Sequence, residues 1–105
     1  MPSSRYLPAG IFLSLAWPAI ASGVRCPGML DKHPLKQVSL FDGDPRREVE
    51  LVPQDGGWRL SFPPSDPGEG FTLLCQYVGT PRTTIVQLRR DVKVCRFRGT
   101  NVLCR

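Results

Sequence analysis

Residues 71–78 read F-T-L-L-C-Q-Y-V, and this stretch decides the fold class of the chain. Phe71, Leu73, Cys75 and Tyr77 stand at alternate positions, so a β-strand would place all four side chains on one face. The opposite face is also partly apolar, which favours a central place in a sheet. The stretch therefore predicts a buried strand with neighbouring strands on both sides.

Short segments with strand-like patterns occur throughout residues 37–104, separated by Gly, Pro and Asp. The predicted strands are residues 37–41, 48–52, 58–62, 71–78, 83–88, 92–98 and 101–104. Pro63–Gly70 contains three prolines and is predicted to be a surface loop, whereas residues 31–35 hold one helical turn at most. The predicted fold is all-β: a small antiparallel sheet of about six or seven strands, folded as a sandwich or a partly open barrel.

The first residues have the features of a secretory signal peptide. Arg5 supplies positive charge, residues 9–20 form an apolar run that is short for a membrane span, and Ala19-Ile20-Ala21 fits a cleavage site. We expect a signal peptide over residues 1–21, one small domain over residues 22–105, and no transmembrane segment after cleavage. The predicted location is periplasmic or secreted.

Four cysteines, at positions 26, 75, 95 and 104, remain in the predicted domain. A short exported domain meets an oxidising compartment and has a small core, so two disulfides are expected. The cysteines are too far apart for the C-x2-4-C pairs of a zinc site, and there is no C-x-x-C redox motif. The spacing therefore predicts structural disulfides and no metal site.

The closing stretch, V-C-R-F-R-G-T-N-V-L-C-R at residues 94–105, predicts a hairpin closed by a disulfide. Gly99-Thr100 suits a two-residue type II′ turn, which favours glycine at its first position. The resulting register pairs Cys95 with Cys104 at a position without mutual backbone hydrogen bonds, where the Cα atoms lie about 4.5 Å apart.

This register leaves Cys26 to pair with Cys75, and that arrangement is preferred. Two alternatives stay open: 26–95 with 75–104, and 26–104 with 75–95. Chain-entropy estimates give about 2.7 kcal/mol for the short loop of the preferred pairing and about 4.1 kcal/mol for its long loop. The Cys26–Cys75 disulfide should therefore contribute more to stability.

Basic residues are concentrated at the C-terminal end of a chain whose formal net charge is +5. From Arg82 onward there are seven Lys and Arg residues and one acid. Such asymmetry indicates an anionic partner, although a solvated basic face or a charged edge hairpin would also explain it. The candidate anion- or partner-binding residues are Arg89, Arg90, Lys93, Arg96 and Arg98.

Catalytic chemistry has little support in the sequence. His33 is the single histidine, in a segment predicted to be an exposed loop, and the cysteines are assigned to disulfides. Asp42, Asp44 and Glu69 would serve a glycan-directed hydrolase only if two carboxylates lay about 5–9.5 Å apart in one cleft. We therefore expect a protein that is not an enzyme and uses no cofactor and no metal.

A series of short motifs follows in a recognisable order. They are Cys26-Pro27, Leu40-Phe41-Asp42-Gly43-Asp44-Pro45, Leu51-Val52-Pro53, Trp58, Cys75-Gln76-Tyr77, Gly79-Thr80, Leu88, Cys95 and Cys104. This order, C-P…F-D-G-x-P…L-x-P…W…C-x-Y…T…L…C…C, resembles a family of small exported proteobacterial proteins without an assigned function. The resemblance implies a bacterial periplasmic or secreted protein framed by these four cysteines, and it implies no activity.

The preferred interpretation is an exported envelope protein that acts as a non-catalytic binding or interaction module through its basic C-terminal hairpin or its Pro-rich loop. An acidic envelope protein, a glycan or an anionic lipid headgroup would be the partner, and nucleic acid is not expected in that compartment. The alternatives are a small glycan-directed hydrolase and a purely structural envelope protein.

Overall fold

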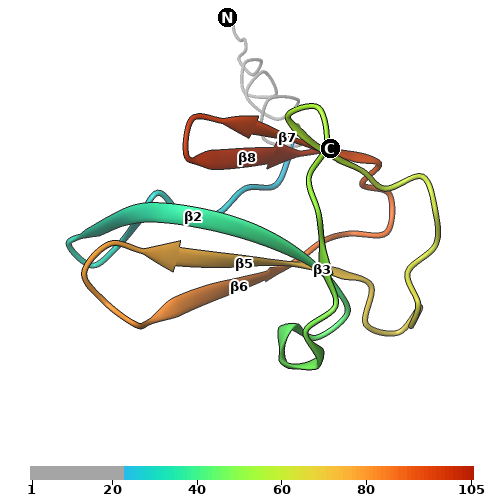
Figure 1. Cartoon of the computed structure of the whole chain (residues 1–105), viewed down its shortest axis with the longest axis horizontal. Helices are drawn as coiled ribbons and strands as arrows, with labels where there is room; N and C mark the ends of the chain where they lie inside the picture. The colour runs from blue at the N-terminus through green and yellow to red at the C-terminus, as the bar shows by residue number, and fades with distance from the viewer. Residues whose placement is uncertain (1–22) are drawn as a thin grey trace, which may run out of the picture.

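The computed structural model describes residues 23–105, which form two antiparallel β-sheets arranged in two layers (Figure 1). The first sheet has the order β1-β2-β5-β6, with β3 also paired to β2, and the second has the order β4-β7-β8. The strands are β1 (Met29–Leu30), β2 (His33–Asp42), β3 (Glu50–Leu51), β4 (Gly57–Arg59), β5 (Phe71–Tyr77), β6 (Thr83–Gln87), β7 (Val94–Arg98) and β8 (Asn101–Cys104).

The predicted all-β antiparallel class is confirmed, as a sandwich of two sheets and not a closed barrel. The described residues contain eight strands, one more than the upper predicted number, and a single helical turn, the 3-10 helix η2 (Pro45–Arg47). None of their helices is long and apolar enough to cross a membrane. The predicted signal peptide, residues 1–21, lies outside the described residues.

Strand β5 lies in the middle of the first sheet, between β2 and β6, as its sequence predicted. The side chains of Phe71, Leu73, Cys75 and Tyr77 are all buried. Leu73 pairs with Leu40 of β2, and neither residue has any exposed area. Complete burial of a leucine side chain contributes about 1.5–3 kcal/mol, so this pair is a principal source of stability.

The start of β2 differs from the prediction. Residues 31–35, expected to be a loop with at most one helical turn, contain the first three residues of β2. His33 therefore lies in a strand and is half-buried, with its Nδ1 atom 2.8 Å from the carbonyl oxygen of Val78. The prediction was wrong because His33 and Pro34 pair with the two-residue strand β1, which the sequence pattern did not indicate, and Leu35 pairs with Tyr77 at the distant end of β5.

The closing hairpin has the predicted register, with Cys95 opposite Cys104 and Arg98 opposite Asn101. Cys95 and Cys104 form a disulfide with a Cα–Cα distance of 4.0 Å. Gly99 has φ +65°, whereas Thr100 is not among the residues with positive φ, as a type II′ turn requires. The local turn therefore sets the position of the disulfide.

The second disulfide joins Cys26 to Cys75 of β5, with a Cα–Cα distance of 5.9 Å. The preferred pairing is thus confirmed, and the two alternative pairings are wrong. The same N-terminal segment also contacts the second sheet, because the side chain of Asn101 in β8 hydrogen-bonds both the N–H and the carbonyl oxygen of Cys26. Cys26 therefore ties the two layers together, through its sulfur to β5 and through its backbone to β8.

Replacing Cys26 and Cys75 with alanine should lower the free energy of unfolding by about 4 kcal/mol, against about 2.7 kcal/mol for alanine at Cys95 and Cys104. The longer loop restricts the unfolded chain more strongly, and both pairs lose equal side-chain volume. Urea unfolding of the two double variants measures the difference. A larger loss for the 95–104 variant would contradict the loop-length argument.

Gly57 of β4 lies so close to β7 that an added Cβ would collide with the carbonyl oxygen of Cys95. We expect Gly57→Ala to lower the free energy of unfolding by about 1–3 kcal/mol, because the two strands must separate to admit the methyl group. The matched control is Gly28→Ala, since nothing lies within 4 Å of a Cβ at that position. Thermal or urea unfolding measures the stability of both variants. Equal stability of the two would refute the close-approach explanation.

Candidate partner-binding surface

The five basic candidates fall into two groups in the structure. Arg96 and Arg98 lie on β7 and are exposed, with side chains on the face opposite the buried Cys95. Arg89, Arg90 and Lys93 lie in the connection between β6 and β7. The predicted placement of Arg96 and Arg98 on an outward face is therefore observed, while the binding role of all five remains a prediction.

Pairing of β4 with β7 adds a third arginine to this outward face. Gly57 lies opposite Arg96 and Arg59 lies opposite Val94, so Arg59, Arg96 and Arg98 share one side of the second sheet. Sequence reasoning missed Arg59 because β4 and β7 are far apart in the chain. No local pattern around Arg59 indicates which strand it will face.

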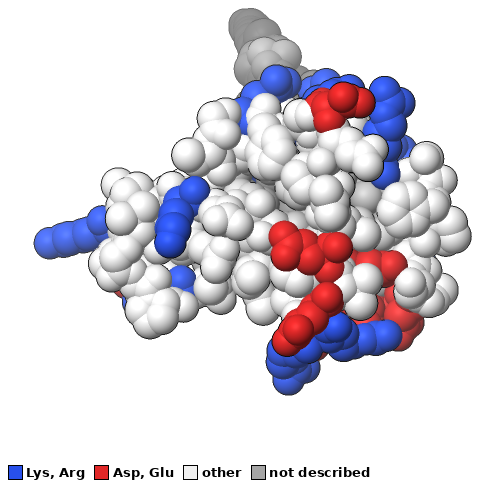
Figure 2. All heavy atoms as spheres, viewed as in Figure 1, with Lys and Arg blue, Asp and Glu red and all other residues white. Residues whose placement is uncertain are grey.

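We call Arg59, Arg96 and Arg98 the basic face. In Figure 2, Lys and Arg atoms gather along the upper part of the molecule, where Figure 1 shows the second sheet, and an acidic side chain lies among them. The salt bridges among residues 23–105 involve none of these three arginines. The Arg96 guanidinium instead donates a hydrogen bond to the carbonyl oxygen of Asp55 at 3.1 Å. The positive charge of the basic face is therefore not neutralised by described carboxylates within 4 Å.

Acidic residues gather at the other end of the molecule, around η2, together with Arg46 and Arg47 (Figure 2). Asp44 is the N-cap of η2: its carboxylate accepts hydrogen bonds from the backbone N–H and the guanidinium of Arg46. Arg47 forms an ion pair with Glu69 at 2.6 Å. Here opposite charges face each other, unlike on the basic face.

The three carboxylates of the hydrolase alternative therefore hold structural roles. Asp42 is buried and accepts hydrogen bonds from the backbone N–H and the hydroxyl of Ser65, so it anchors the Pro-rich loop. The Arg46 side chain, which hydrogen-bonds Asp44, lowers the pKa of that carboxyl to about 2, and the backbone N–H of Arg46 acts in the same direction. A glycosidase acid needs a raised pKa, so Asp44 has the opposite property.

In the part of the chain that the structure describes, no three His, Cys, Asp or Glu side chains lie close enough together to hold a metal ion. All four cysteines form disulfides.

In a comparison with known protein families, residues 30–104 match the family described as Type VI secretion system Tli immunity protein. The chain belongs to this family. The matched segment includes the last seven of the eight strands in full, with Cys75, Cys95 and Cys104, and it begins after Cys26. Membership agrees with the predicted resemblance to a small bacterial family, whereas the motif order behind that prediction stays untested. Neither the curated proteins nor the solved structures contain a match to the chain.

The lowered pKa of Asp44 is directly measurable by NMR titration of its carboxyl carbon. We expect a midpoint of about 2 in the intact protein, and Arg46→Ala should return it toward 3.8 because the hydrogen bonds of the guanidinium are lost. A group with a depressed pKa stabilises the folded state above pH 3.8, and this contribution disappears as the pH falls through about 2. An unchanged midpoint in the variant would show that Arg46 is not the cause.

Proposed function

We propose that this chain is an exported immunity protein that binds a toxin of a type VI secretion system and blocks the toxin without catalysis. Membership of the Tli immunity family, over residues 30–104, is the observation that carries this proposal. An immunity protein acts by occupying its toxin, so the function requires a stable, complementary surface and needs no catalytic group.

The periplasm is the proposed site of action. Two disulfides, both with buried cysteines, suit an oxidising compartment. The predicted signal peptide at residues 1–21 would deliver the chain there, ahead of an incoming toxin. Disulfides also make a small domain resistant to unfolding, which suits a protein that must be ready before the toxin arrives.

The basic face supports recognition of an acidic toxin surface. Arg59, Arg96 and Arg98 project from paired strands, so their positions are set by the sheet, and a sheet is a more rigid support than a loop. Positive charge that is not compensated by nearby carboxylates attracts an acidic partner over a distance and accelerates association at low salt. Such steering favours capture of the toxin before it reaches its target.

The proposal is tested with purified type VI toxins of the bacterium that encodes this chain, each titrated against the protein by surface plasmon resonance. One toxin should bind, and co-production of the chain in the periplasm should protect cells from it. Arg96→Glu with Arg98→Glu should weaken binding by about tenfold or more, because like charges then face the acidic toxin. The thermal midpoint should barely change, since both arginines are exposed.

The matched control is Lys32→Glu with Lys36→Glu, which makes the same change of net charge at exposed positions near the β1–β2 turn. This control should bind the toxin almost as the wild type does. Absence of binding and of protection with every toxin would overturn the proposed function. An equal loss of toxin affinity in both double variants would show that the basic face is not the contact. The net charge of the protein would then account for the loss.

A further inference from the structure

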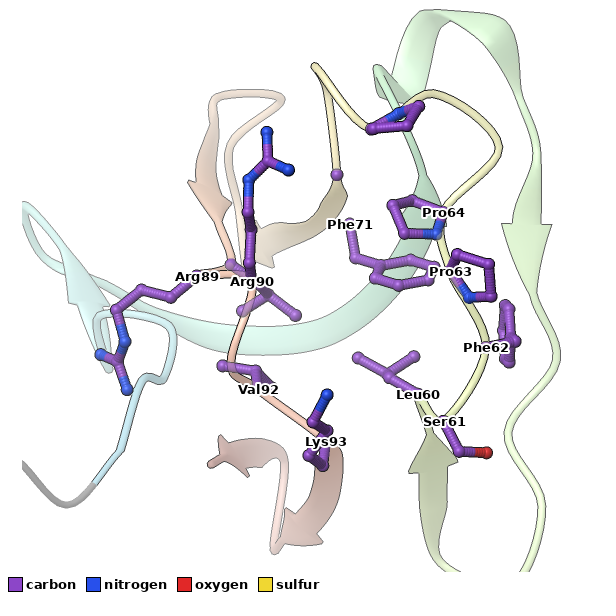
Figure 3. A pocket seen from close by; sticks show the side chains of 13 residues that line it. Leu60, Ser61, Phe62, Pro63, Pro64, Phe71, Arg89, Arg90, Val92 and Lys93 are labelled. Carbon is purple, nitrogen blue, oxygen red and sulfur yellow. The ribbon is translucent and has the colours of Figure 1, made fainter.

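A groove opens between the segment Leu60–Pro64, which follows β4, and the segment Arg89–Lys93, which leads into β7 (Figure 3). Its volume is about 350 Å³. Four of the residues that line it are members of the hydrophobic core: Leu60, Phe71, Leu88 and Val92. The groove therefore gives access to the apolar interior between the two sheets. Its base is apolar, whereas the basic face is a charged surface.

One wall of the groove is apolar and conformationally restricted. Phe62 is 45% exposed, although its ring packs edge-on against Phe71 with centroids 5.5 Å apart. Pro63 and Pro64 follow directly and also line the groove. Proline fixes φ, so this wall has little conformational freedom to lose when a ligand enters. An exposed phenylalanine beside a preformed groove is suited to pack against an apolar side chain.

The opposite side of the groove carries positive charge. Figure 3 shows Arg90 and Lys93 across the groove from Pro63 and Pro64, whereas the Arg89 side chain points away. Arg89 is also engaged by Asp91 at 3.1 Å. No salt bridge within residues 23–105 includes Arg90 or Lys93. Two positive charges thus border an apolar groove, and neither forms an ion pair with a described carboxylate within 4 Å.

We propose that this groove is the anchoring site for the toxin, and that it receives an apolar side chain projecting from an acidic loop. The apolar base and the Phe62 wall select the inserted side chain, while Arg90 and Lys93 select carboxylates on either side of it. The inference rests on the proposed function, because it names how the toxin is held.

The size of the groove favours a protein loop over a lipid. A volume of about 350 Å³ stands near the lower end of the roughly 300–1,000 Å³ of small-molecule pockets, so it accommodates one or two side chains more readily than the chains of a phospholipid. Anchoring by one aromatic or aliphatic residue in a desolvated pocket, with charges at the rim, is also how many protein interfaces obtain most of their affinity.

The first test uses the toxin identified by the binding experiment above. Phe62→Ala should weaken toxin binding by about tenfold or more, because the wall that packs on the inserted side chain is lost. Val78→Ala is the matched control: Val78 is 49% exposed, does not line this groove, and should change affinity by less than about twofold. Arg90→Glu with Lys93→Glu should lower affinity by a similar factor and weaken its dependence on salt.

The second test needs no toxin and uses two short synthetic peptides. One carries a Leu-Phe pair between flanking Asp and Glu residues, and the other has Ser-Ser in place of Leu-Phe. In NMR titrations of the intact protein, the first peptide should shift the backbone amide signals of Phe62, Phe71 and Val92, and the second should not. A lysine version of the first peptide should also fail to shift them, because it meets Arg90 and Lys93 with like charge.

The outcomes separate the inference from the function on which it rests. If the wild type binds and neutralises a toxin while Phe62→Ala and the Arg90/Lys93 variant bind it equally well, the groove is not the anchor and the proposed function stands. If the acidic Leu-Phe peptide enters the groove but no type VI toxin binds the protein, the groove is a peptide site and the immunity function fails. Signals that shift with phosphatidylglycerol vesicles and not with the peptides would overturn the assignment to a protein loop.

Discussion

The Cys26–Cys75 disulfide lies in the core between the two sheets, and the short segment around it contacts both layers. The Cys26 sulfur bonds to β5 of the first sheet, while its backbone N–H and carbonyl oxygen are held by the side chain of Asn101 in β8. Val24 exchanges two backbone hydrogen bonds with Cys104, each 2.8 Å long. With sheets this small, the covalent bond and its neighbouring hydrogen bonds set how the layers face each other, and the groove at their end depends on that placement.

Charge is distributed so that one end of the molecule is internally compensated and the other is not. Around η2, Arg46 and Arg47 pair with Asp44 and Glu69, which stabilises the turn and satisfies the carboxylates. On the second sheet the arginines of the basic face lack such partners among the described residues. In the proposed function, the uncompensated end attracts an acidic toxin, while the compensated end holds the Pro-rich loop in shape.

Local patterns predicted the elements whose geometry depends on neighbouring residues. The alternation in residues 71–78 identified the central strand, and Gly99-Thr100 identified both the hairpin register and the Cys95–Cys104 disulfide. The start of β2 escaped prediction because its first two residues pair with β1, a strand too short to show a pattern, and Leu35 pairs with Tyr77, 42 positions away. For the same reason Arg59 was missed, since only the β4–β7 pairing brings it beside Arg96.

The amino-acid composition and the spacing of residue types by themselves determined an all-β domain with two disulfides and a basic C-terminal part. They also offered few residues suited to catalysis. These properties follow from residue types and short-range periodicity, which are present in the chain before it folds. The tertiary structure decided which arginines share a face, that the candidate carboxylates are engaged as caps and anchors, and that Phe62, Arg90 and Lys93 border one apolar groove. Sheet pairing and packing bring together segments that are distant in sequence, and no local pattern records which segments those will be.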